Sequence, residues 1–256
     1  MSQSTETGVL VLGDSHAECF FQQGNDAKIV GQNISVYGEA MLAATVTGFG
    51  RARSALNVNT RVRKLIEQHH QQSQHILFAL GQVDVELGLY YRWVVKDEMI
   101  EPEALFSEII GLYIRNIKVL HGDLHPVIKG INQTVLKKQP HAFHYTSRIL
   151  FEKAGNPAKM AALKAKLLEV YPSYDVRLFI NNMFNEILAE AAKKAGIAYF
   201  DINDAIVNKE TGEVDDAFCP NFSDHHIVNS VAAHKLHIKH LMTAIGRSSP
   251  DDQKTF

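Results

Sequence analysis

The chain has 256 residues, enough for one α/β domain with a sizeable core and short for two domains. Hydrophobic residues make up 46%, charged residues 21%, and the formal net charge is −2, so the composition favours neither nucleic acid nor an anionic membrane as partner. The N-terminus lacks the basic and apolar regions of a signal peptide, and Cys19 and Cys219 are too few for a disulfide framework. We therefore expect a cytoplasmic protein with two free thiols.

Apolar runs and amphipathic spacings alternate along the chain. Residues 9–12 form a continuous apolar run, typical of a strand buried on both faces, and a helix should start near Ala17. Later strands are expected at residues 28–30 with 34–36, 75–80, 126–131 and 197–202. Later helices are expected at residues 53–71, 102–120, 175–195 and 229–245, the third of them ending at Gly196.

This alternation predicts an α/β fold, a three-layer α/β/α sandwich with a mostly parallel sheet. We expect one domain over residues 1–256, with a partly helical insertion above the sheet at 133–171 and a flexible tail at 247–256. Ligands of such sheets bind outside the carboxyl ends of the strands. Two expected strand ends carry polar residues after a glycine, in the segments Gly13-Asp14-Ser15-His16 and Gly81-Gln82-Val83-Asp84.

Ser15 is the first candidate for chemistry. It follows the first strand and precedes a helix, whose N-terminus favours negative charge. A serine hydroxyl becomes an effective nucleophile when a histidine takes its proton. The same position also suits a serine that only caps the helix. The segment Ser223-Asp224-His225-His226 before the last helix offers an imidazole with a neighbouring carboxylate, although it also fits a solvated loop.

With these residues the chain resembles the SGNH/GDSL hydrolase superfamily, in particular a subgroup linked to bacterial surface-glycan biosynthesis whose third block reads GEID. The match to the first block is VLGDSH. The resemblance implies a flavodoxin-like sheet, with Ser15 as nucleophile and its N–H as an oxyanion donor. Residues 43–50, AATVTGFG, resemble the GATAxGL segment of that subgroup, which implies the N–H of Ala43 as second donor, with Gly48 and Gly38 as competitors.

The third and last blocks depart from the family pattern. Val83 stands where GxND has an oxyanion asparagine, and loss of one such donor costs on the order of a hundredfold in rate. In the last block, DxxH, Ser223 stands where the aspartate is expected. The resemblance implies His226 as the base and His225 as its rival. Asp224 is a candidate orienting acid, and a dyad oriented by a backbone carbonyl is the alternative.

The residues expected to line the substrate pocket follow the two strands that end in glycine. They are Asp14, His16, Gly81, Gln82 and Asp84. Two of them also suit structural roles: His16 in the first turn of a helix, and Asp84 as a tie for the loop after the strand.

Two further clusters have both a functional and a structural interpretation. His234, His237 and His240 recur at a spacing that can bind a metal, but interleaved lysines favour a solvated helix face. We therefore expect no metal site, and the chemistry requires no cofactor. Residues 90–93, YYRW, either form a wall for a sugar or acyl group or pack into the core.

The sequence thus predicts a serine ester hydrolase or acyltransferase of SGNH type, and the resemblance alone suggests an O-acylated carbohydrate as substrate. The expected partner is a small-molecule or glycan ester, with no nucleic acid and no membrane; the oligomeric state is open. The alternative is a catalytically impaired SGNH-fold module that binds a partner in glycan biosynthesis, which Val83 and Ser223 favour. Geometry separates the two, since an enzyme needs the imidazole of His225 or His226 within hydrogen-bonding reach of Ser15.

Overall fold

A parallel five-stranded sheet forms the centre of the described chain. The computed structural model describes residues 6–21, 34–51, 56–152, 155–221 and 224–246. The strands are β1 (Thr7–Gly13), β2 (Ile34–Ala40), β3 (His75–Ala79), β4 (His125–Lys129) and β5 (Ala198–Phe200). All pair in parallel, in the order β2-β1-β3-β4-β5. This is the flavodoxin-like order, so the predicted fold class is confirmed. The strand expected at residues 28–30 and the tail at 247–256 lie outside the described residues.

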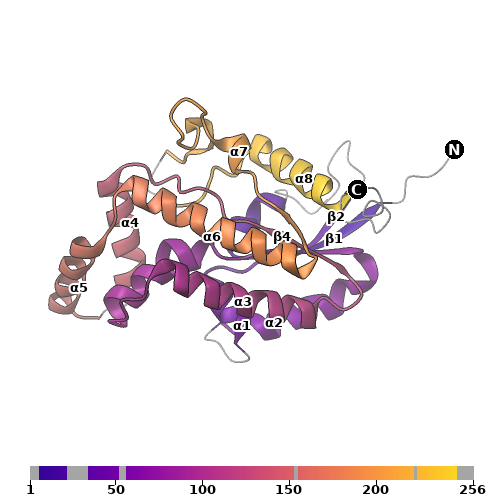
Figure 1. Cartoon of the computed structure of the whole chain (residues 1–256), viewed down its shortest axis with the longest axis horizontal. Coiled ribbons are helices and arrows are strands. Elements are labelled where there is room, and N and C mark those ends of the chain that lie inside the picture. Colours follow the sequence, from indigo (N-terminus) through magenta and orange to yellow (C-terminus); the bar gives the residue numbers. More distant parts are fainter. Residues whose placement is uncertain (1–5, 22–33, 52–55, 153–154, 222–223, 247–256) are drawn as a thin grey trace.

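Helices cover both faces of the sheet (Figure 1). One face packs against α1 (Val46–Gly50), α2 (Val58–His69), α3 (Pro102–Leu120) and α6 (Tyr174–Ala195). The other packs against the 3₁₀ helix η1 (Ser15–Phe20), α7 (Asn203–Ile206) and α8 (Val231–Gly246). The bounds of α3 are those expected from the sequence, and α6 ends at Gly196, whose φ of +69° suits a glycine C-cap.

The continuous apolar run in β1 follows from burial on both faces. Leu10 and Leu12 pack into the core on the α3 side, whereas Val9 and Val11 pack into the core on the α8 side. All four are fully buried. Burying such a side chain stabilises the fold by about 1.5–3 kcal/mol. A polar residue pointing to either face of the sheet would therefore destabilise the central strand.

Residues 133–171, where we expect an insertion, contain α4 (Gln139–Phe151) and α5 (Pro157–Val170), which lie together at one end of the molecule (Figure 1). They pack against residues 83–95, which contain the π-helical turns Asp84–Gly88 and Tyr91–Val95. Tyr90 is buried there, and the indole of Trp93 donates to the carbonyl of Ile100 over 2.9 Å. These two aromatics therefore belong to a core and not to a sugar-binding wall.

The prediction that the histidines of the last helix face solvent is wrong for two of them. His234 and His237 are buried, and the Nδ1 of His234 lies 2.8 Å from the carbonyl of Cys19 in η1. Phe20 packs edge-on against His237 with ring centroids 5.1 Å apart. Since η1 packs beside α8, these histidines face η1 and not solvent. Both cysteines are free thiols.

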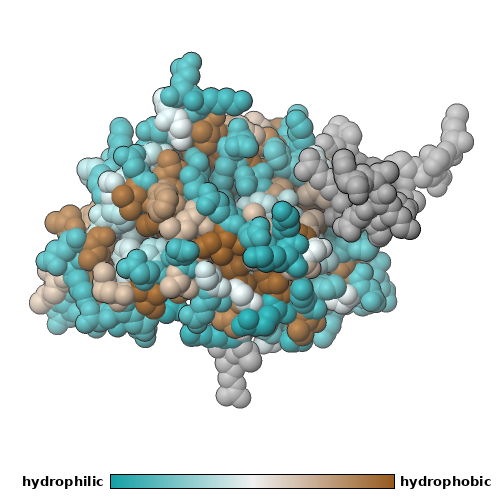
Figure 2. Space-filling model, in the orientation of Figure 1, coloured by the Kyte–Doolittle hydropathy of each residue, from teal (hydrophilic) through white to brown (hydrophobic). Residues whose placement is uncertain are grey.

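The visible surface is mostly hydrophilic, with hydrophobic residues in separate patches (Figure 2). Singly exposed apolar side chains are usual on soluble surfaces. Within the described part of the chain, no helix is both long enough and apolar enough to cross a membrane.

Candidate active site

The candidate site lies at the carboxyl ends of β1 and β3, where the chain order along the sheet reverses. This switch point is the usual ligand crevice of a flavodoxin-like sheet. Ser15 comes directly after β1, and the Asp14 carboxylate caps η1 by accepting the N–H of His16 over 2.9 Å. A Cβ on Gly13 would lie 2.5 Å from the Cβ of Ala17 and 2.6 Å from the carbonyl of Ala79. Only glycine therefore lets the helix start so close to β3.

Ser15, His226 and Asp224 form a continuous hydrogen-bonded chain. The Oγ of Ser15 lies 2.7 Å from Nε2 of His226, and Nδ1 of His226 lies 2.7 Å from Oδ1 of Asp224. The fold thus brings Ser15, which follows β1, into contact with His226, which precedes α8 and lies 211 residues later in the chain. This is the hydroxyl, imidazole and carboxylate geometry of serine hydrolases.

Asp224 contacts His226 although it lies two residues before it, and not three as in the family pattern DxxH. Its Oδ1 also accepts the backbone N–H of His226 over 3.3 Å, an Asx turn across two residues. The turn places the carboxylate beside Nδ1 of the same histidine. A carboxylate two residues before the histidine can therefore take the position that the family fills from three residues before.

The pair shifts the pKa values of both partners. Burial alone would raise the pKa of Asp224, but the hydrogen bond and charge of His226 outweigh burial and lower it. Burial alone would lower the pKa of His226, but the hydrogen bond and charge of Asp224 raise it. Asp224 is therefore ionised at neutral pH, and the imidazolium of His226 is stabilised.

His225, the rival base, points elsewhere. Its Nδ1 lies 2.7 Å from Oε2 of Glu86, and its ring packs against Tyr145 with centroids 4.8 Å apart. Burial would raise the pKa of Glu86, but the hydrogen bond and charge of His225 lower it. Sequence reasoning missed Glu86. The one available signal was its helical spacing from Gln82, whose Nε2 donates to Oε1 of Glu86 over 3.0 Å.

Of the expected oxyanion donors after β2, Gly48 does not fit. Its N–H donates to Oγ1 of Thr45 over 2.8 Å as part of the N-cap of α1. Gly38 lies within β2. Ala43 is exposed on the segment that Met41 ties to the end of β1, through a 2.8 Å bond from its N–H to the carbonyl of Gly13. Ala43 therefore remains the candidate partner of the Ser15 N–H.

Ala43 has a φ of +58°, in the left-handed region that favours glycine. The resemblance puts a glycine at this position, and this conformation gives the physical reason. We expect Ala43→Gly to retain the fold and to stabilise it by up to about 1 kcal/mol, because relief of strain outweighs the added entropy of the unfolded chain. Urea unfolding of the two proteins checks this; a clear loss of stability would contradict it.

Asp84 holds the segment after β2 in place, in keeping with the structural role that its position also suited. It is buried, and its carboxylate accepts the N–H of Val46 over 2.6 Å, the N–H of Thr47 over 3.3 Å and the hydroxyl of Thr47 over 3.1 Å. Burial raises the pKa of Asp84 to about 6 against these bonds. Asp84 thus caps α1 and fixes the segment that carries Ala43.

Gln82 and Gly81 also support the site from inside. The amide of Gln82 donates to the carbonyl of Asn132 over 3.0 Å and accepts its N–H over 2.8 Å. Gly81 has a φ of +130°, and a Cβ there would lie 2.6 Å from the ring of Phe184. Val83 packs against the insertion. The third block therefore contributes structure, and Gln82 also lines a small cavity together with Asp14 and His16.

Cavities adjoin these residues in the described part of the chain. Asp14, His16 and Gln82 line a small cavity of about 10 Å³ together with Lys129, and this cavity has room for about one water. A larger cleft of about 280 Å³ opens beside Asp224, and its walls include Lys138 and His141. The larger cleft has about the size of a small-ligand pocket and lies on the Asp224 side of the site.

No protein-family model and no curated protein matches the chain. Solved structures do match. A GDSL-like lipase from Bacteroides thetaiotaomicron has a TM-score of 0.52 at 10% identity, covering 95% of this chain and 90% of its own. A catalytic serine-to-alanine mutant of an acetylxylan esterase from Geobacillus stearothermophilus has a TM-score of 0.56 at 11% identity, covering 96% and 97%. The chain has the fold of the GDSL-like lipases and these esterases. At such low identity the likeness concerns the fold, and the chemistry depends on this chain's own residues.

Proposed function

We propose that the protein is a serine esterase in which Ser15 attacks a carboxylic ester. The observation that supports this most strongly is the chain of 2.7 Å contacts from Ser15 through His226 to Asp224. The contact supports an enzyme over a partner-binding module, because the imidazole lies within hydrogen-bonding reach of the hydroxyl.

The reaction follows from these contacts. The Oγ of Ser15 forms a bond to the ester carbonyl carbon while Nε2 of His226 takes its proton. Asp224 remains ionised and stabilises the imidazolium. The tetrahedral intermediate then expels the alcohol, which receives the proton from His226, and leaves an acyl group on Ser15. Water, activated by His226, cleaves that acyl ester in the same way.

The N–H groups of Ser15 and Ala43 are the proposed oxyanion donors. Val83 is apolar and buried at 8% exposure, so it supplies no side-chain donor. We therefore expect a modest hydrolytic rate on simple activated esters.

The proposed substrate is an O-acylated carbohydrate with a small acyl group. The cleft beside Asp224 has polar and charged walls, including Lys138, His141 and Asn221, which suits hydroxyl-rich ligands better than long acyl chains. The acetylxylan esterases that share the fold are named for such a substrate. Transfer of the acyl group to an alcohol other than water uses the same steps, which makes an acyltransferase the second candidate.

Labelling with a fluorophosphonate tests the nucleophile. We expect covalent labelling of the wild type and none of Ser15→Ala, together with loss of p-nitrophenyl acetate hydrolysis in the same variant. Ser107→Ala, an exposed serine of α3, is the matched control and should behave as the wild type. Equal labelling of the wild type and Ser15→Ala would remove Ser15 as nucleophile and favour the partner-binding alternative.

Adding a sugar acceptor to the hydrolysis assay separates the two enzymatic candidates. An acyltransferase should release p-nitrophenol faster with the acceptor and form an acylated sugar that mass spectrometry detects. A hydrolase should form free acid at an unchanged rate.

A further inference from the structure

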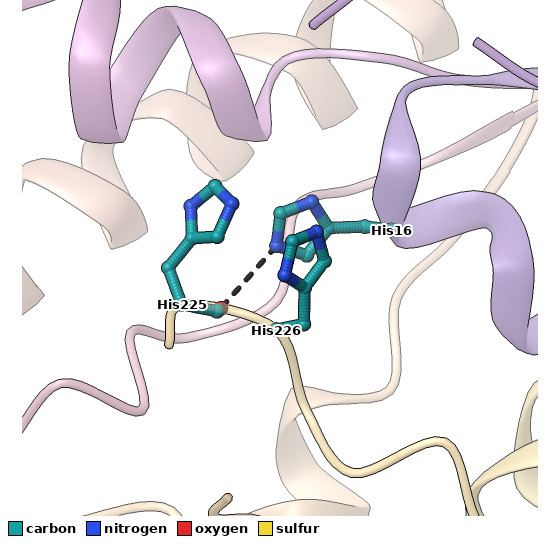
Figure 3. A group of neighbouring side chains, drawn as sticks. All are labelled: His16, His225 and His226. Atoms are coloured by element: carbon teal, nitrogen blue, oxygen red, sulfur yellow. Dashed lines mark hydrogen bonds between the residues drawn. The ribbon is translucent and has the colours of Figure 1, made fainter. Parts of the chain in front are cut away.

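Three histidine rings gather in the site (Figure 3). One of them, His226, lies 2.7 Å from the Oγ of Ser15. His16 comes from η1, and His225 and His226 come from the loop before α8. Each offers one ring nitrogen, and the three nitrogens lie within 4.8 Å of one another. The His16 and His226 rings stack with centroids 4.3 Å apart, and His225 stands edge-on to both. Because His16 and His225 are 209 residues apart, no spacing motif reveals the cluster.

Each of the three imidazoles has a carboxylate at its Nδ1. The pairs are His16 with Asp14 at 3.2 Å, His225 with Glu86 at 2.7 Å and His226 with Asp224 at 2.7 Å. A carboxylate at Nδ1 keeps the proton on that nitrogen, which leaves Nε2 of His225 and of His226 as lone-pair donors. Nε2 of His16 lies 3.3 Å from the carbonyl of His225, so His16 has to give up this contact and its Nε2 proton to bind a cation. Histidines that bind metals are almost always anchored in this way.

The charge around the cluster is negative when the imidazoles are neutral. Asp14 is 1% exposed, and its Oδ2 has no hydrogen-bond partner among the described residues. The side chain of Glu86 is 10% exposed. A divalent cation among the three rings would offset the carboxylate charge.

We propose that His16, His225 and His226 form a binding site for one first-row divalent cation of the Zn²⁺ class, and that the ion competes with the Ser15–His226 contact. Imidazole nitrogen suits Zn²⁺, and sites with three protein ligands keep one position open for a further ligand. A serine oxygen or a water completes the fourth position.

The geometry explains why ion and nucleophile compete. Zn–N bonds of about 2.0–2.1 Å place tetrahedral ligand nitrogens about 3.3 Å apart, so these nitrogens must approach by about 1.5 Å at most. Ring planes that stack cannot both point their lone pairs at one ion, so the His226 ring has to turn. Turning takes its Nε2 away from the Oγ of Ser15, which now lies at 2.7 Å. Inhibition by the ion rests on the proposed esterase function, but ion binding does not.

Titration calorimetry with ZnCl₂, on full-length protein freed of metal by a chelator, tests the site. We expect one ion per chain in the wild type and at least tenfold weaker binding in His225→Gln and in His16→Gln. Glu86→Gln should also weaken binding about 10- to 100-fold by removing an anchoring carboxylate. His70→Gln, an exposed histidine, and Cys219→Ser, which removes a thiol that could bind zinc, should bind as the wild type does. Equal affinity in the wild type and both histidine variants would overturn the site.

The labelling experiment supplies an independent readout. Saturating Zn²⁺ should block fluorophosphonate labelling of Ser15 in the wild type, and the same concentration should leave most of the labelling that His225→Gln shows without metal. Undiminished wild-type labelling at saturating Zn²⁺ would overturn the competition. If the wild type is never labelled, the proposed esterase function fails, while calorimetry still decides the metal site.

Discussion

Replacement of Asp224 by asparagine is expected to lower kcat/KM for an activated ester by on the order of 10³–10⁴-fold. Asparagine keeps the volume but offers Nδ1 of His226 no charge, and it can hold the imidazole in the wrong tautomer. The loss should fall on kcat, because Asp224 stabilises an imidazolium that forms only as Ser15 reacts. A loss below tenfold would mean that Ser15 and His226 work as a dyad.

The pH dependence of kcat/KM tests the same role of Asp224, because it predicts the direction in which the midpoint moves. His226 acts as base only when neutral, and its pKa is raised above the ordinary 6.5 by Asp224, against the effect of burial. Therefore kcat/KM of the wild type should rise with pH through a midpoint above 6.5. In Asp224→Asn the midpoint should move to lower pH, since burial then acts unopposed by that carboxylate. The assay contains a chelator, and Asp215→Asn, an exposed carboxylate nearby in sequence, is the control. An unmoved midpoint would contradict the role given to Asp224.

The fold could be predicted from the sequence because burial leaves a pattern that one strand or helix carries by itself. Residues 9–12 are apolar at every position because β1 has helices on both faces. The helix at residues 102–120 has an amphipathic spacing and a proline at its start. By contrast, the burial of His234 and His237 depends on where η1 packs, and η1 lies more than 200 residues earlier in the chain.

The candidate site was predictable only in part, for the same reason. Ser15 could be found because a strand end, a glycine and a helix start coincide at one place. The contact between Asp224 and His226 depends on a backbone turn, which the residue spacing of the family pattern does not predict. The link from Glu86 to His225 joins residues 139 apart. The sequence leaves Gly48 as a plausible oxyanion donor, but in the structure its N–H donates to the hydroxyl oxygen of Thr45.

Removal of Glu86 should affect stability more than any surface carboxylate does. Its side chain is 10% exposed and pairs with that of His225, which is 4% exposed. Breaking a buried pair by deleting one partner typically costs about 3–5 kcal/mol, because the other group stays buried without compensation. We therefore expect Glu86→Ala to lose about that much unfolding free energy at pH 7, measured by urea denaturation. Glu108→Ala, on the exposed face of α3, should change it by about 0.5 kcal/mol or less.

The pH dependence of stability separates the effect of the Glu86 charge from simple packing. The pKa of Glu86 is lower in the folded state than its ordinary 4.5, since the hydrogen bond and charge of His225 outweigh burial. Its contribution is therefore complete above about pH 4.5 and is lost as the pH falls through the folded-state pKa. The difference in unfolding free energy between the wild type and Glu86→Gln should shrink in that range. If instead it stays constant, Glu86 stabilises the fold through its shape and its bond to Gln82, and His225 is held in place by neighbours such as Tyr145 and not by charge.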